Sequence, residues 1–134
     1  MHDEIKFKNN KDLIDFLKKE SEYSLFAEIC SLIGLDLNNN LIYKQMQNRS
    51  KEPFNYFIID PYDYLNFIKK YSCLAIFHSH LIGCENPSNF DVKTSENCCH
   101  AFIIYSVSSE KFNIYEPEYR NYNVNVIQEL KQLI

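Results

Sequence analysis

The chain has 134 residues, of which 46% are hydrophobic, 15% aromatic and 24% charged, and its formal net charge is -4. This length and composition predict a single globular domain over residues 1–134 and exclude a disordered segment. The lysines are scattered and the net charge is negative, so we expect no nucleic-acid partner.

The cysteine pattern and the lack of long apolar segments bear on the compartment in which we expect the protein. No stretch resembles a secretion signal, and none approaches the ~20 apolar residues of a membrane span. The five cysteines are odd in number and have no C-x-x-C spacing. We therefore expect a soluble, cytoplasmic protein with free thiols and no membrane partner.

The first part of the chain carries one helical pattern and two strand patterns. Apolar residues at helical spacing predict a helix over residues 10–20, followed by a polar connection at 21–24. The apolar run 25–35 predicts a buried strand, although its period does not exclude a helix. Turn-forming residues at 36–40 join it to a second strand over 41–46.

The middle of the chain leads to an apolar run that ends in two histidines. Aromatic and β-branched residues predict a strand over 54–59, after a polar loop. A helix begins at Asp60 as N-cap, with Pro61 in its first position. The continuously apolar run 74–77 that follows this helix is typical of a central strand.

The last part of the chain repeats the alternation of helix and strand. A polar segment predicts a helix capped by Ser88 or by Asp91. The expected elements here are a helix over 92–100, strands over 101–107 and 111–115, and a closing helix from residue 126. The whole pattern predicts an α/β (α+β) fold with a mixed sheet and flanking helices.

Two histidines and an aspartate form a candidate metal site. His78 and His80 are separated by one residue, so on a strand both side chains point to the same face. Alone, this pair is also compatible with two partly exposed histidines at a strand end. Asp91 follows after a loop that can fold back over the strand end, and two imidazoles with one carboxylate are a common catalytic zinc set.

Two further residues complete a candidate hydrolytic site. Glu28 lies in an otherwise apolar run, where a buried carboxylate needs a partner, although an edge residue facing water is the alternative. A carboxylate that does not bind the metal is the group that transfers the proton in zinc hydrolases, and Glu28 fits that role. Ser88 is the candidate hydrogen-bond donor to an oxyanion.

The order and spacing of these residues resemble the JAMM signature of the JAB/MPN metallopeptidases. Seven residues separate His80 from Ser88, and two separate Ser88 from Asp91. The resemblance extends over most of residues 10–107, including residues 28–34, the loop 48–53 and residues 57–61. Within the family, the pattern after Ser88 is most similar to the JAB domains of phage tail-assembly K-type proteins and their bacterial relatives.

The resemblance implies a fold, a cofactor and an activity. It implies the cytidine-deaminase-like JAB/MPN fold, a curved mixed sheet in three α-β-α layers. It implies one zinc ion per chain bound by His78, His80 and Asp91, with Glu28 as general base and Ser88 as oxyanion donor. The implied activity is hydrolysis of a peptide or isopeptide bond.

The sequence departs from the family pattern at two positions and leaves the substrate open. Leu81 stands where most members have proline, and Ser31 where a small glycine-type residue is usual. The chain is too short for the insertions with which eukaryotic members grip ubiquitin, so the expected substrate is a phage or cell-wall peptide, or the tail of a small ubiquitin-like modifier. The alternative is a non-catalytic scaffold of the same fold. Cys84 is a further candidate ligand beside the metal.

Overall fold

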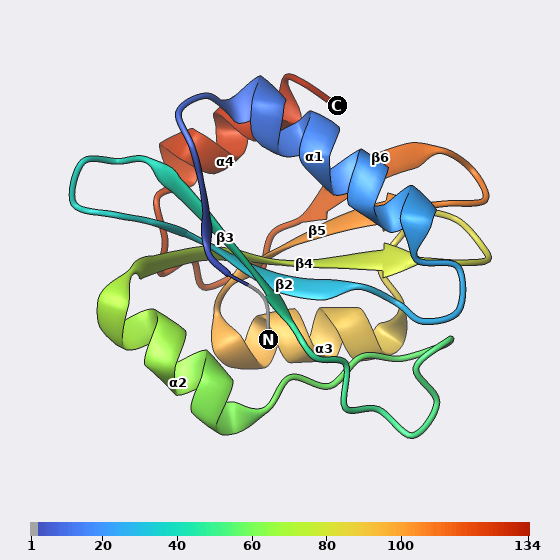
Figure 1. Ribbon diagram of the computed structural model, residues 1–134. Coiled ribbons are helices and arrows are strands. Elements are labelled where there is room, and N and C mark those ends of the chain that lie inside the picture. Colours follow the sequence, from blue (N-terminus) through green and yellow to red (C-terminus); the bar gives the residue numbers. More distant parts are fainter. Residues whose placement is uncertain (1–2) are drawn as a thin grey trace.

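The computed structural model describes residues 3–134, which form one six-stranded sheet and four helices (Figure 1). The strands are β1 (Ile5–Phe7), β2 (Cys30–Leu35), β3 (Leu41–Met46), β4 (Ser72–His80), β5 (Ala101–Ser106) and β6 (Lys111–Tyr115). The helices are α1 (Asn10–Tyr23), α2 (Pro61–Lys70), α3 (Asn89–Cys98) and α4 (Val124–Lys131). The mixed α/β class predicted from the sequence is confirmed.

The strand order places β4 inside the sheet, between β2 and β5. The order is β1-β3-β2-β4-β5-β6, and β4 runs parallel to β5 while every other neighbouring pair is antiparallel. The chain leaves the C-terminal end of β4, passes through α3 and returns to β5. Loops at the C-terminal ends of neighbouring parallel strands are where α/β sheets bind ligands.

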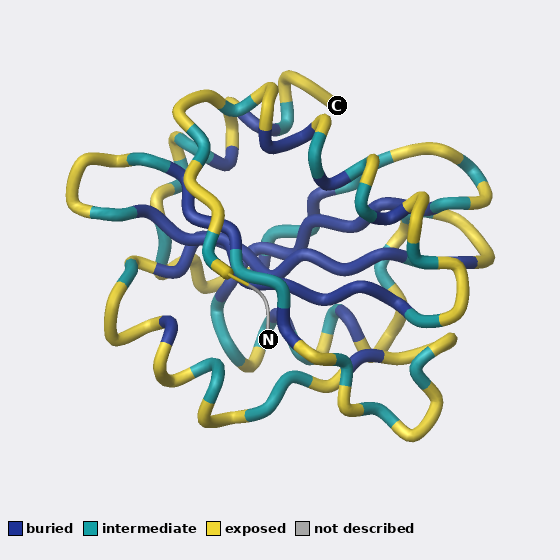
Figure 2. The backbone as a smooth tube through the Cα atoms, viewed as in Figure 1, coloured by how far each residue is buried: buried dark blue, intermediate teal, exposed yellow. Residues whose placement is uncertain are grey.

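Helices cover both faces of the sheet, which explains the continuously apolar strands. Helices α1 and α4 lie over one face, and α2 and α3 lie under the other (Figure 1). Each face has its own buried core, one centred on Leu17, Phe77 and Ile103, the other on Phe67 and Phe102. The strand backbone is accordingly buried along β2, β4 and β5, while the loops at the ends are exposed (Figure 2).

Polar side chains define where the helices begin. Asn9, Asp60, Ser88 and Asn123 each accept a hydrogen bond from a backbone N–H in the first turn of the following helix. Such a cap satisfies a donor that has no partner within the helix and stabilises it by ~1 kcal/mol. No helix among residues 3–134 is long and apolar enough to cross a bilayer.

Two predictions for the first half of the chain are wrong in their boundaries. Helix α1 continues through residues 21–23, because the Ser21 hydroxyl donates to the carbonyl of Leu17 and needs no water. The strand expected over residues 25–35 begins only at Cys30. Glu28 therefore lies in the segment that leads into β2, and not within the strand as predicted.

The strand predicted over residues 54–59 does not form. These residues have no regular secondary structure, and Phe57 is buried while Phe54, Tyr56 and Ile58 are exposed. Aromatic and β-branched residues fit a strand by propensity, but propensity is readily overridden by packing. Here they form a loop beside the histidines of β4.

Two other elements agree with the sequence apart from their ends, and so do the cysteines. Strand β4 is longer than the predicted run 74–77 and includes both histidines. Of the two candidate caps of α3, the structure selects Ser88, so that the helix begins at Asn89 and ends at Cys98. All five cysteines are free, as predicted.

Gly34 lies where α2 packs closely on the sheet, with no room for a side chain. An added Cβ would lie 2.9 Å from a ring carbon of Phe67 and 2.9 Å from the carbonyl oxygen of Ser72. We expect Gly34→Ala to lower the free energy of unfolding by about 1–3 kcal/mol in urea titrations, because overpacking strains the core. In Gly34→Ala/Phe67→Leu the cost should be less than the sum of the two single variants. Strict additivity would show that Phe67 is not the obstacle.

Candidate metal centre

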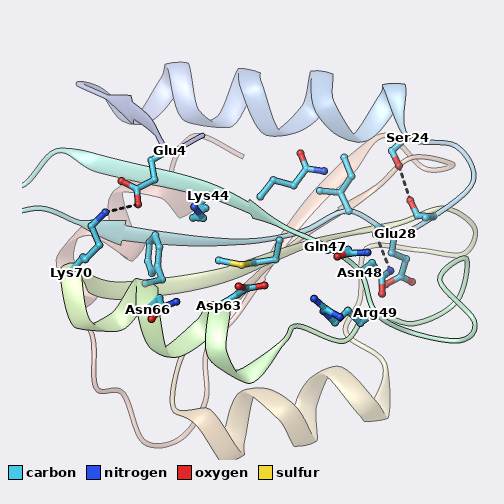
Figure 3. Close-up of a pocket in the computed structure, with 15 residues that line it drawn as sticks. Glu4, Ser24, Glu28, Lys44, Gln47, Asn48, Arg49, Asp63, Asn66 and Lys70 are labelled. Atoms are coloured by element: carbon cyan, nitrogen blue, oxygen red, sulfur yellow. Dashed lines mark hydrogen bonds and ion pairs between the residues drawn. The ribbon is translucent and has the colours of Figure 1, made fainter. Parts of the chain in front are cut away.

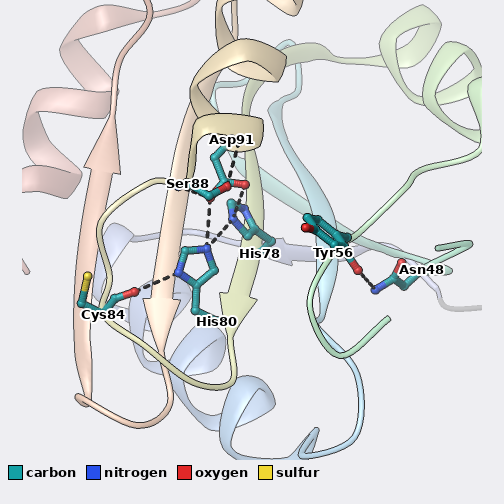
Figure 4. Close-up of polar contacts among 7 residues, drawn as sticks. All are labelled: Asn48, Tyr56, His78, His80, Cys84, Ser88 and Asp91. Carbon is teal, nitrogen blue, oxygen red and sulfur yellow. Dashed lines mark hydrogen bonds and ion pairs between the residues drawn. The ribbon is translucent and has the colours of Figure 1, made fainter. Parts of the chain in front are cut away.

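The side chains of His78, His80 and Asp91 converge on one point at the end of β4 (Figure 4). The Nε2 atoms of the two imidazoles are 3.2 Å apart. His78 Nε2 lies 3.1 Å from Asp91 Oδ1, and His80 Nε2 lies 3.0 Å from Asp91 Oδ2. The predicted trio of metal ligands is therefore assembled.

The two elements that carry the trio fix its position. On β4, Ile76, His78 and His80 point to the side of α2 and α3, whereas Phe77 and Ser79 point to the opposite side. Asp91 is the third residue of α3, and its carboxylate accepts a hydrogen bond from the Ser88 backbone N–H at 2.9 Å. This capping box places the carboxylate at the helix N-terminus, where a negative charge is favoured.

The spacing of the donor atoms fits a tetrahedral metal ion. With metal–ligand bonds of about 2.0–2.1 Å, neighbouring donors of a tetrahedral site lie about 3.3 Å apart. The two Nε2 atoms are 3.2 Å apart, and each lies 3.0–3.1 Å from one of the two Asp91 oxygens, which is close to this value. Two neutral imidazoles and one carboxylate also leave one position of such a site open. These residues can hold a metal ion.

Burial and neighbouring polar groups shift the pKa values of the three side chains in opposite directions. Burial alone would raise the pKa of Asp91, but hydrogen bonds from both histidines outweigh it and hold this pKa well below its usual range. Burial lowers the pKa of His78, which is fully enclosed. Burial also opposes the charged form of His80, but the Asp91 carboxylate and the Cys84 carbonyl raise its pKa overall.

The outer nitrogens of the two histidines have different surroundings. His80 Nδ1 lies 2.9 Å from the carbonyl oxygen of Cys84, the kind of contact that orients metal-binding histidines. The Cys84 thiol points away from His80, so the predicted role of Cys84 as a ligand is not seen (Figure 4). His78 Nδ1 is buried without a hydrogen-bond partner among residues 3–134, and the Phe57 ring stacks on this imidazole at 4.6 Å.

Glu28 is held beside the trio by the backbone of β4. The Ser79 hydroxyl accepts a hydrogen bond from the Ile29 N–H at 2.9 Å, and the Ser79 N–H donates to the Ile29 carbonyl. These bonds extend the β2–β4 register past the Cys30–His78 pair, which brings Glu28 level with His80. Burial raises the pKa of Glu28 to about 8, and the nearby Asp91 charge adds to this effect while His80 opposes it.

Ser88 has a structural role that the sequence had left open. Its Oγ accepts the Asp91 backbone N–H at 3.1 Å and so begins α3. A hydroxyl that accepts through a lone pair still has its hydrogen free to donate. Ser88 can therefore cap the helix and serve the predicted oxyanion role at the same time.

Asn48 organises the loop that covers the site, a role that sequence reasoning missed. Its amide nitrogen donates to the backbone carbonyls of Glu28, Pro53 and Tyr56 at 2.9 to 3.3 Å, and its amide oxygen accepts from the N–H groups of Ser50 and Ile58. The bond to Tyr56 is drawn in Figure 4. The only sequence signal was an asparagine at the start of a polar loop, which is common in turns.

Two cavities meet at Glu28. The first has a volume of about 390 Å³ and is lined by Glu28, His80, Ser88 and Asp91, with His78 buried beneath. The second, of about 810 Å³, lies between α2 and β3 and has charged walls of both signs, including Lys44, Arg49 and Asp63 (Figure 3). Of the five predicted site residues, the second cavity contains Glu28 alone, so the first is the candidate active site.

The loop over the site should depend on Asn48. We expect Asn48→Ala to lower the free energy of unfolding by about 2–3 kcal/mol, because several backbone groups lose their partner at once. The metal affinity should change little, since the trio lies on β4 and α3. Asn55→Ala, in the same loop, is the control. A loss of stability no larger than that of Asn55→Ala would contradict this role for Asn48.

The buried Glu28 carboxyl predicts a pH-dependent stability of the metal-free protein. Its pKa is about 8 in the folded protein against an ordinary value of 4.5, so between these pH values the folded state holds one proton more than the unfolded state. The free energy of unfolding therefore falls as pH rises, by at most about 1.4 kcal/mol per pH unit. With EDTA present, Glu28→Gln should exceed the wild type in stability at pH 8 but not at pH 5.

The control for this effect is Glu118→Gln, which removes an exposed carboxylate. Urea titrations at both pH values compare the three proteins. Equal stability differences between wild type and Glu28→Gln at pH 5 and pH 8 would show that Glu28 ionises normally in the folded protein.

Comparisons with known proteins bear on the fold. No family model matches the sequence, and no curated protein matches it. Among solved structures, the chain is similar to the solution structure of protein DSY2949 from Desulfitobacterium hafniense, a target of the Northeast Structural Genomics Consortium. The two chains are 23% identical, the match covers 78% of this chain and 77% of that one, and the TM-score is 0.60. At this identity the likeness concerns the fold alone.

Proposed function

We propose that this chain is a zinc-dependent metallopeptidase of the JAB/MPN type, which hydrolyses a peptide or isopeptide bond. The observation that carries the proposal is that His78, His80 and Asp91 converge on one point, and that His80 and Asp91 line one cavity together with Glu28. The six-stranded mixed sheet with helices on both faces is compatible with the α-β-α layers of that family. The order of these residues in the chain also resembles the JAMM signature.

The donor set favours zinc as the metal. Two imidazoles and one carboxylate with an open fourth position are typical of catalytic zinc. When bound, zinc lowers the pKa of a coordinated water to about 7 and polarises a carbonyl. The low pKa of Asp91 and the lowered pKa of His78 keep the carboxylate ionised and this imidazole neutral, which are the forms that bind a metal.

Glu28 is the residue placed to move the proton. Its carboxyl lies in the wall of the same cavity as His80 and Asp91, without a hydrogen-bond partner of its own among the contacts of the described residues. Burial raises its pKa to about 8, close to the operating range that suits a general base and acid. Glu28 thus takes a proton from the attacking water and returns it to the leaving amine.

Ser88 is the residue placed to stabilise developing negative charge. Its hydroxyl lines the cavity next to Asp91, and its hydrogen is free because Oγ serves as acceptor for the Asp91 N–H. A hydroxyl that donates to the oxyanion in a site shielded from water lowers the activation barrier by about 3 kcal/mol. Phe57, stacked on His78, shields that side of the site.

Metal content and activity of three variants test the proposal. We expect about one zinc per chain in the wild type and in Glu28→Gln, and a loss of affinity of about 100-fold or more in His80→Ala. His100→Ala is the control, because His100 pairs with Tyr64 outside the site and should leave zinc binding intact. Hydrolysis of a peptide library should fall by about 10²–10⁴-fold in Glu28→Gln.

Two results separate the possible failures. A wild-type protein that binds no zinc at micromolar concentration would contradict the metalloenzyme. A protein that binds zinc through His80 yet cleaves neither peptides nor ubiquitin-like fusions would instead support a non-catalytic scaffold of the same fold.

A further inference from the structure

The cavity beside the metal trio has walls that the proposed chemistry does not use. Besides the candidate catalytic residues, it is lined mainly by large apolar side chains, namely Phe54, Tyr56, Phe57, Leu81, Ile82 and Phe90. Its volume of about 390 Å³ is at the lower end of the range for small-ligand sites, about 300–1,000 Å³. The apolar walls therefore enclose room for a side chain of a bound substrate.

One wall is aromatic and is fixed in place by ring contacts. Tyr56 and Phe90 meet edge to face with centroids 5.9 Å apart, and Phe57 meets Phe90 in the same way at 6.2 Å. Phe57 is buried against His78, but 46% of Tyr56 and 40% of Phe90 are exposed. The wall thus presents rigid aromatic surface to the cavity within one residue of the metal ligand Asp91.

The opposite wall follows directly from β4. Leu81 is the residue after His80 and is buried, while Ile82 is 65% exposed. Gly83, with φ of +85°, turns the chain after Ile82, and its carbonyl accepts hydrogen bonds from the hydroxyls of Ser106 and Ser108. The loop is therefore tied down while Ile82 remains in water.

The walls of the cavity offer no cationic partner to an acidic occupant. No lysine or arginine lines this cavity in the part of the chain that the structure describes. An acidic side chain would be removed from water there without an ion pair to replace it. An apolar side chain instead covers surface that is otherwise exposed to water, which is favourable at about 25 cal/mol per Å².

We propose that the substrate is a peptide with a large apolar residue, aromatic or aliphatic, adjoining the scissile bond, and that Tyr56, Phe90 and Ile82 bind this side chain. The inference rests on the proposed function, since it takes the trio as the place of the scissile bond. It favours a peptide substrate over a modifier tail made of small residues, which would leave both walls in water.

Small hydroxamates test the cavity without turnover, because the hydroxamate binds the metal and its substituent lies beside it. Calorimetry on zinc-loaded protein compares acetohydroxamate with 3-phenylpropionohydroxamate, and includes an acidic and a basic analogue, succinic monohydroxamate and 3-aminopropionohydroxamate. We expect the phenyl compound to bind about 10-fold more tightly than acetohydroxamate or better, and the charged compounds to gain nothing.

Variants of the two walls assign the effect to named residues. In Tyr56→Ser and in Ile82→Ser the preference for the phenyl compound should fall to about threefold or less. Tyr62→Ser, which removes an exposed tyrosine of α2 outside the cavity, should keep the full preference. Zinc content is measured for each variant, so that a damaged metal site is distinguished from a lost wall.

The outcomes separate this inference from the function on which it rests. If acetohydroxamate binds and the phenyl compound binds no better, or if a charged analogue binds best, the inference is wrong while the metal site stands. If zinc or acetohydroxamate fails to bind to the wild type, the proposed function fails and the inference fails with it.

Discussion

The carboxylate of Asp91, buried between two imidazoles, is the interaction on which the rest of the site depends. Removing an ionised carboxylate from water is costly unless hydrogen bonds and positive charge replace the water. Asp91 finds both in the Nε2 atoms of His78 and His80, the N–H of Ser88 and the N-terminus of α3. The same contacts bind α3 to the end of β4. A metal ion bound at this point would add positive charge beside the buried carboxylate.

The fold brings three separate segments to this carboxylate. Strand β4 supplies both histidines, the first turn of α3 supplies the carboxylate, and the Ser79–Ile29 bonds align Glu28 with His80. Because β4 is an inner strand with parallel and antiparallel neighbours, its C-terminal end is held on both sides. The burial that positions Glu28 also raises its pKa, so the metal-free folded protein is less stable at neutral pH than at pH 5.

Sequence reasoning predicted most of this arrangement, for physical reasons that also explain its errors. His78 and His80 share a face because strands have a two-residue period, and Ser88 is one of the two caps expected for α3, although its capping box with Asp91 was not predicted. Residues 54–59 look like a strand, yet the side chain of Asn48 satisfies their backbone groups in place of a neighbouring strand. The Cys84 carbonyl on His80 has no sequence signal, since every residue has a carbonyl. Zinc and peptide hydrolysis stay predictions.

The most direct test of the metal site is a crystal structure of the zinc-soaked protein, with diffraction data recorded above and below the zinc absorption edge. We expect one anomalous peak per chain, within about 2.0–2.2 Å of His78 Nε2, His80 Nε2 and an Asp91 carboxylate oxygen. A peak at the cysteines near the end of α3, or no peak at the end of β4, would contradict it.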